Sequence, residues 1–138
     1  MSDVEYIIET TDLSKSYGPH LALENLNLKI RKGATGLLGP NGAGKSTFLK
    51  TILGLIQATS GHGTVLGHDI RTEGAAIRSR IGYMPEYDAL NPDMEAIHQV
   101  KYSGELLGMN PIVAMSRAHE VLQYVGLGEQ RYLSLIHI

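Results

Sequence analysis

The sequence has 138 residues, a net charge of -2 and no cysteine, with 43% hydrophobic and 19% charged residues. This composition is typical of one globular domain, and the lack of cysteine excludes disulfides and thiolate metal sites. The slight acidity argues against binding of nucleic acid by charge alone, and no apolar run approaches the roughly 20 residues that a membrane span needs.

The first third of the sequence predicts strands separated by turns. A β-like run begins at Tyr6 and ends in the polar residues 10–16, and Gly18-Pro19 predicts a turn. Leucine and isoleucine alternate with polar residues over positions 25–30, which predicts a half-buried strand. Residues 36–38, Gly-Leu-Leu, predict a short buried strand that leads directly into a glycine-rich segment.

From Lys45 onward the apolar residues recur at helical spacing, so the pattern changes from strand to helix. The elements predicted from there are, in chain order, a helix from Lys45 to about residue 60, a strand at 64–66, one or two helical turns at 75–80, a strand at 81–84, a helix starting at 91–93 and a helix starting at Pro111.

The glycine-rich segment carries the strongest functional motif. Residues 39–46 read Gly-Pro-Asn-Gly-Ala-Gly-Lys-Ser and match the pattern G-x-x-x-x-G-K-[ST]. Glycines let backbone N–H groups approach phosphate oxygens closely, and the helix that follows points its positive end at the same place. In this motif Lys45 would bridge the β- and γ-phosphates, and the Ser46 hydroxyl would ligate Mg²⁺.

The flanks of this loop resemble one family, the ABC ATPases. Residues 39–47 closely resemble the family's Walker A motif, and residues 13–18, Leu-Ser-Lys-Ser-Tyr-Gly, resemble its A-loop. Residues 81–86 resemble the strand that leads into its Q-loop. The resemblance covers residues 4–132 and implies an α/β P-loop NTPase fold with an antiparallel β-subdomain and the start of an α-helical subdomain.

The resemblance also implies roles for particular side chains. Tyr17 would stack on adenine, although a tyrosine in a turn can also pack against the sheet. Glu86 stands where the family usually has Gln, and would reach Mg²⁺ and the attacking water; its alternative is a solvated loop carboxylate. Lys45 and Glu86 are thus the expected catalytic residues, Ser46 and Glu86 the expected metal ligands, and ATP and Mg²⁺ the expected cofactors. The residues expected to bind nucleotide are Tyr17, Gly39, Pro40, Asn41, Gly42, Ala43, Gly44, Lys45, Ser46 and Thr47.

Two motifs that the family uses for hydrolysis do not occur in the sequence. The signature Leu-Ser-Gly-Gly-Gln is expected soon after Tyr132, and no apolar run ending in Asp-Glu, the Walker B motif, follows Lys45. We therefore expect a partial nucleotide-binding domain over residues 1–132, truncated before both motifs and without hydrolysis of its own. Residues 133–138, Leu-Ser-Leu-Ile-His-Ile, resemble a translated transposon end from sequencing libraries and are interpreted as an adapter-derived tail; the alternative is a natural apolar tail.

At the level of function, the resemblance implies the nucleotide-binding subunit of an ABC transporter. ATP hydrolysis by the full-length protein would power transport, and Glu86 favours export of the ABC-2 or drug-export type. The implied partners are a transmembrane permease and a second ATPase subunit arranged head to tail, with no nucleic acid. The implied location is cytoplasmic, on the inner face of the cell membrane. The alternatives are a soluble ABC ATPase and a truncated product that does not hydrolyse ATP.

Overall fold

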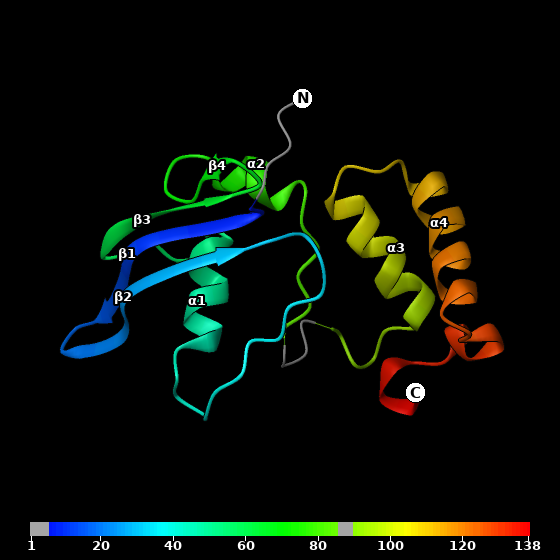
Figure 1. Cartoon of the computed structure of the whole chain (residues 1–138). Helices are drawn as coiled ribbons and strands as arrows, with labels where there is room; N and C mark the ends of the chain where they lie inside the picture. The colour runs from blue at the N-terminus through cyan, green and yellow to red at the C-terminus, as the bar shows by residue number, and fades with distance from the viewer. Residues whose placement is uncertain (1–5, 86–89) are drawn as a thin grey trace. The chain divides into compact units, whose positions relative to one another are not determined.

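The computed structural model describes residues 6–85 and 90–138, which fall into two compact units, Met1–Tyr83 and Met84–Ile138. The first unit holds a four-stranded antiparallel sheet with the strand order β2-β1-β3-β4 (Figure 1). Its strands are β1 (Ile8–Tyr17), β2 (His20–Ile30), β3 (Ser60–Val65) and β4 (His68–Asp69). The antiparallel β-subdomain expected from the sequence is therefore present.

Strand β1 is longer than the sequence pattern predicts. The prediction that it ends in polar residues 10–16 is wrong, because β1 continues to Tyr17 and pairs with β2 on one edge and β3 on the other. The polar side chains are satisfied inside this pairing: the buried Thr10 hydroxyl donates to the Leu26 carbonyl at 2.9 Å and accepts from the Leu28 N–H at 3.0 Å. Asp12, with φ of 48°, forms a bulge that breaks the register between Thr10 and Leu13.

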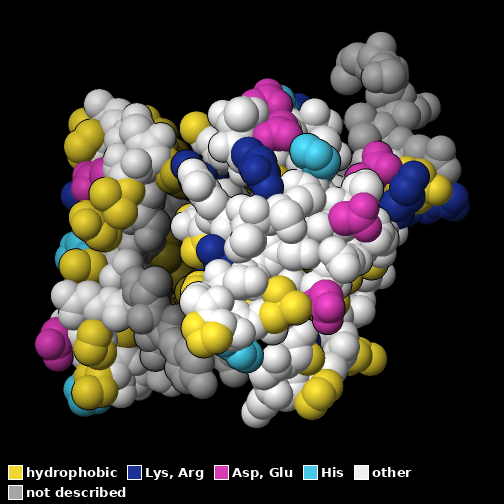
Figure 2. Space-filling view, turned by 90° about the vertical axis from the view of Figure 1, so that its left-hand side faces the viewer, with side chains coloured by type: hydrophobic (Ala, Val, Ile, Leu, Met, Phe, Trp, Pro, Cys, Tyr) yellow, Lys and Arg dark blue, Asp and Glu magenta, His cyan; other side chains and the backbone are white. Residues whose placement is uncertain are grey.

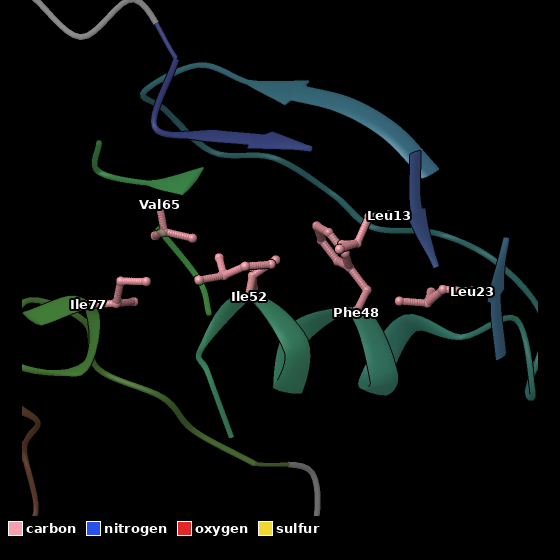
Figure 3. Packing of buried hydrophobic residues seen from close by; sticks show 7 residues of the cluster. Leu13, Leu23, Phe48, Ile52, Val65 and Ile77 are labelled. Carbon is pink, nitrogen blue, oxygen red and sulfur yellow. The ribbon is translucent and has the colours of Figure 1, made fainter. Parts of the chain in front are cut away.

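Helix α1 (Lys45–Ile52) packs its apolar side against the sheet, as Figure 3 shows. The spacing of its buried residues follows the helical period, so Phe48 and Ile52 lie one turn apart on the same face. Helix α2 (Gly74–Arg78) adds Ile77 to this core. The buried apolar cluster of the first unit consists of Leu13, Leu23, Phe48, Ile52, Val65, Ile70 and Ile77.

Helix α1 ends at Ile52, earlier than the predicted end near residue 60. Gly54 has φ of 64°, a left-handed conformation that stops the helix. The Leu55 N–H donates to the Lys50 carbonyl at 2.9 Å, and the Gly54 N–H donates to the Thr51 carbonyl at 3.0 Å. This is the Schellman arrangement, which satisfies the last carbonyl groups of the helix. The apolar residues beyond Gly54 therefore continue the pattern without continuing the helix.

Two strands that the sequence predicts are not formed. Residues 34–40 and 81–85 have no regular structure, and Leu38 and Met84 are 94% and 92% exposed. The prediction of a buried strand at residues 36–38 and of a strand at 81–84 is therefore wrong for this structure. The reason is that a short apolar segment becomes a strand only when another strand pairs with it, and no described strand pairs with either segment. An apolar groove of about 420 Å³ lies between residues 33–37, β2 and α1.

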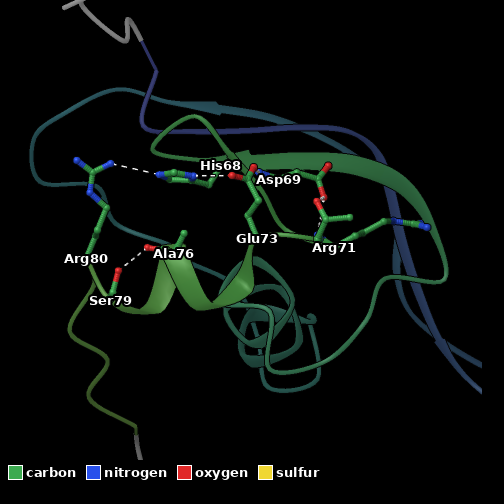
Figure 4. A network of polar contacts seen from close by, with 8 residues as sticks. His68, Asp69, Arg71, Glu73, Ala76, Ser79 and Arg80 are labelled. Carbon is green, nitrogen blue, oxygen red and sulfur yellow. Dashed lines mark hydrogen bonds and ion pairs between the residues drawn. The ribbon is translucent and has the colours of Figure 1, made fainter. Parts of the chain in front are cut away.

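A polar network holds the connection between β4 and α2 (Figure 4). The Glu73 carboxylate pairs with His68 Nδ1 at 2.9 Å and accepts from the Asp69 N–H at 2.8 Å. On the other side of the imidazole ring, Arg80 Nη1 lies 3.3 Å from His68 Nε2. The hydrogen bond from His68 is the main reason that the pKa of Glu73 is lowered. The network thus joins both ends of α2 to one side chain of β4.

The second unit is helical. Helix α3 (Ala96–Leu106) and helix α4 (Pro111–Tyr124) precede two short 3₁₀ helices, Gly128–Tyr132 and Leu135–His137. Helix α3 begins at Ala96 rather than at residues 91–93, where Asn91 instead accepts a turn hydrogen bond from the Asp93 N–H at 3.1 Å. The buried core is formed by Ala96, Ile97, Ala118 and Leu122. The expected start of an α-helical subdomain is present.

The surface of the described residues shows no strong segregation by charge on the face in Figure 2. Lys and Arg side chains are interspersed there with Asp and Glu side chains and with hydrophobic ones. Within residues 6–85 and 90–138, the helices are all too short or too polar to cross a bilayer.

Two glycines of the sheet unit provide a test of its packing. Gly61 and Gly67 both have φ of 81°, but an added Cβ atom at Gly61 would collide with the carbonyl of Asp12, whereas at Gly67 it would meet open space. We expect Gly67→Ala to lower the free energy of unfolding by about 1–2 kcal/mol, the cost of the left-handed conformation. We expect Gly61→Ala to lower it by about 3 kcal/mol or more, because the bulged backbone must also move. Urea unfolding followed by circular dichroism measures both, and equal losses would contradict this packing.

Asp69 provides a test of how a carboxylate with a lowered pKa makes the stability of the fold depend on pH. Its carboxylate accepts hydrogen bonds from the N–H groups of Arg71 at 2.8 Å and Thr72 at 3.0 Å, and these bonds lower its pKa. A lowered pKa in the folded state stabilises the fold above the unfolded-state pKa, and this contribution is lost as the pH falls through the folded-state pKa. We expect the stability advantage of the wild type over Asp69→Asn to be constant near pH 6 and to shrink below about pH 4. Urea unfolding of both chains across this range measures it; an advantage that grows on acidification would contradict the assignment.

Candidate functional site

The glycine-rich loop predicted from the sequence connects the segment after β2 to helix α1. Its residues 39–43 are exposed, and Gly42 and Gly44 have φ of 85° and 83°, values that other residues adopt only with strain. The Ala43 N–H donates to the Pro40 carbonyl at 3.2 Å and closes a tight turn. The loop therefore turns sharply just before the helix, and its backbone is accessible to a ligand.

The first turn of α1 lacks a side-chain cap. Its N-cap is Gly44, which has no side chain to accept a hydrogen bond from the helix N–H groups. Helix α4 differs, because there the Asn110 side chain accepts from the Ile112 N–H at 3.0 Å. Uncapped N–H groups at a helix N-terminus, together with the helix dipole, favour an anion. The geometry of the loop therefore fits the phosphate-binding role predicted from its sequence.

Gly44 fixes the position of this helix end against the sheet. An added Cβ atom would collide with the carbonyl oxygen of Ala22 and lie 3.0 Å from Cδ2 of Leu23, and both of these residues belong to β2. Leu23 is buried in the core beside Phe48 of α1. Packing of the core and placement of the loop thus depend on the same contact between α1 and β2.

Lys45 lies over the loop rather than extending into solvent. Its ammonium group donates to the carbonyl oxygens of Gly39 at 2.5 Å and Pro40 at 2.7 Å. Ser46 in the first turn of the helix is exposed, and Thr47 is half-buried. The positive charge of Lys45 and the hydroxyl of Ser46 therefore occupy neighbouring positions at the helix end, where a phosphate group and its metal ion would need them.

Tyr17 lies at the end of β1, next to the two-residue turn at Gly18-Pro19 that the sequence predicts. The strand register pairs Tyr17 with His20 and Lys15 with Leu23, the residue that packs against Gly44. Tyr17 therefore stands two residues, or about 7 Å along the strand, beyond the position opposite the helix start. Its side chain is 47% exposed, so the ring is not simply buried in the sheet.

The structure brings the predicted residues 39–47 together at one end of α1 and places Tyr17 on the neighbouring strand. The predicted residue Glu86 lies outside the described residues. Sequence reasoning missed Lys15, whose ammonium lies over the Tyr17 ring, 5.0 Å from its centroid. The available sign was the spacing of two between Lys15 and Tyr17, which puts both side chains on one face of a strand.

The chain is similar in sequence to several curated ATP-binding proteins. The linearmycin resistance ATP-binding protein LnrL of Bacillus subtilis is 38% identical over 125 residues, which cover 90% of this chain and 40% of that protein. The daunorubicin/doxorubicin resistance ATP-binding protein DrrA of Streptomyces peucetius is 34% identical, with coverage of 90% and 38%. The Nod factor export ATP-binding protein I of Cupriavidus metallidurans is 34% identical, with coverage of 88% and 40%. The chain spans about 40% of the length of these curated relatives.

Solved structures show the same fold. A dimeric post-hydrolysis state of the ATP-binding cassette MJ0796 bound to ADP and Pi is 28% identical with a TM-score of 0.76, covering 91% of this chain and 60% of that one. CbiO1 from Clostridium perfringens, part of the ABC transporter complex cbiONQ, has a TM-score of 0.75 at 23% identity and covers 94% and 54%. The fold is therefore that of the ABC ATPase domains, as the sequence indicates.

A sequence profile for the family described as ABC transporter matches residues 23–136, which include the whole glycine-rich loop and helices α1, α3 and α4. The match takes in most of the chain and agrees with the curated relatives and with the fold. The chain belongs to the ABC transporter family.

Proposed function

We propose that this chain binds ATP as the nucleotide-binding part of an ABC transporter. The observation that carries the proposal is the start of α1, where the left-handed Gly44 leaves the helix uncapped and Lys45 lies over the loop. This arrangement provides N–H donors and one positive charge for a chain of phosphate groups, without rearrangement of the core. Its sequence, Gly39 to Thr47, matches the motif that binds ATP in this family.

The proposed roles of the side chains follow from their positions. Lys45 would leave the carbonyls of Gly39 and Pro40 and bind the β- and γ-phosphates. The exposed Ser46 hydroxyl fits as a ligand of Mg²⁺, which prefers oxygen donors and would neutralise phosphate charge. Tyr17 would stack on adenine through its exposed ring. Glu86 is proposed, from the sequence alone, to assist at the metal ion and the γ-phosphate.

The transport cycle is proposed for the full-length protein. Binding of ATP would close a head-to-tail dimer of ATPase subunits, and hydrolysis would reset a transmembrane permease on the cytoplasmic face of the cell membrane. A dimeric arrangement is supported by the related ATP-binding cassette MJ0796, solved as a dimer with ADP and Pi. Export is supported by the relatives LnrL and DrrA, which are resistance ATP-binding proteins, and by the Nod factor export ATP-binding protein I.

The role of Lys45 can be tested by calorimetric titration of the chain with ATP in the presence of Mg²⁺. We expect Lys45→Met to weaken binding by at least about tenfold, because charge-assisted hydrogen bonds to phosphate are lost. Lys50→Met is the matched control, since Lys50 is an exposed lysine in the last turn of the same helix. An equal affinity for the wild type and Lys45→Met, with both folded by circular dichroism, would contradict the proposed site.

A further inference from the structure

The ring of Tyr17 is held by a lysine of its own strand. The ammonium of Lys15 lies over the ring at 5.0 Å from the centroid, a distance at which a cation is attracted to the aromatic face. Lys15 is half-buried, whereas the Tyr17 side chain is 47% exposed. One face of the ring is thus covered by a cation, while the residue as a whole remains about half exposed.

The pairing of β1 with β2 places both side chains on the side of the sheet that carries the phosphate loop. Leu13 is buried against α1, and the positive-φ residue that disturbs β1, Asp12, precedes it. The register of β1 shifts again between Leu13 and Lys15 and between Lys15 and Ser16, so the face of these side chains follows from their contacts. Lys15 lies directly opposite the core residue Leu23, and its ammonium lies over the ring of Tyr17. Lys15 pairs directly with Leu23, which contacts the start of α1 beside Gly44. Lys15 therefore stands between the loop and the tyrosine ring.

We propose that Lys15 is a positioning residue for the nucleotide base: it orients the Tyr17 ring so that the free face receives adenine. A ring in several rotamers would lose conformational entropy on stacking, and a ring already held by a cation loses less. This inference rests on the proposed function, because it assigns a task to the strand beside the phosphate loop. The rival role for the same ammonium is a direct contact with the phosphates, and the two roles differ in which ligand they affect.

The test compares ATP with inorganic tripolyphosphate, which has the phosphates but no base, by calorimetric titration of the chain. We expect Lys15→Gln to weaken ATP binding about two- to fivefold and to leave tripolyphosphate binding unchanged. Lys15→Arg should restore ATP binding, because a guanidinium group also binds aromatic faces. In Tyr17→Ala, where there is no ring to hold, the further change Lys15→Gln should have no effect on ATP binding.

Lys29→Gln is the matched control, because the ammonium of Lys29 lies over the ring of Tyr6, also at 5.0 Å, at the other end of β2. Lys29→Gln should change neither the affinity for ATP nor the affinity for tripolyphosphate. A loss of tripolyphosphate binding in Lys15→Gln equal to its loss of ATP binding would overturn the proposal in favour of a phosphate contact. Unchanged or tighter ATP binding in Lys15→Gln would also overturn it. Failure of the folded wild type to bind tripolyphosphate would instead contradict the proposed phosphate site.

Discussion

Gly44 holds the start of α1 against the backbone of β2, and no side chain larger than a hydrogen atom fits between them. This contact therefore anchors two parts of the unit: the core with Leu23 and Phe48 on one side, and the glycine-rich loop on the other. Because the anchor is a glycine, it also leaves the helix without a cap. One residue thus sets the position of the helix end and leaves its N–H groups without a side-chain cap, so that a substitution there would disturb both packing and the proposed anion binding.

Strand β1 connects this anchor to the rest of the proposed site. It is paired on both edges, so its geometry is more constrained than that of an edge strand. Its core residue Leu13 is followed by Lys15, which pairs with the buried Leu23, and by Tyr17, whose ring lies beneath the Lys15 ammonium. The polar residues of β1 would suggest a loop by composition alone, yet the buried Thr10 is satisfied by hydrogen bonds to β2. Strand β1 therefore connects the packed core directly to the exposed ring of Tyr17.

The sharp turn of the glycine-rich loop could be predicted from the sequence because the motif requires glycines at fixed spacing, and Gly42 and Gly44 do adopt the left-handed conformation. The full extent of β1 could not, because its second partner, β3, lies about fifty residues further along the chain. Residues 36–38 and 81–84 have the apolar pattern of strands, but a pattern shows only the capacity to pair, and no described strand pairs with them. The position of Lys15 over Tyr17 could be recognised only once β1 was known to extend that far.

Lys45 donates hydrogen bonds to the carbonyls of Gly39 and Pro40, so these two carbonyls would compete with a phosphate for its ammonium group. In the proposed site a phosphate would have to displace these two acceptors, so association would be an exchange of partners for the ammonium group rather than the capture of a solvated charge. The affinity for phosphate would then report the difference between phosphate and carbonyl as acceptors, and would be smaller than the full strength of the new contact. In the proposed site the two loop carbonyls would also satisfy the lysine charge between one nucleotide and the next, so the ammonium group would always have an acceptor within reach.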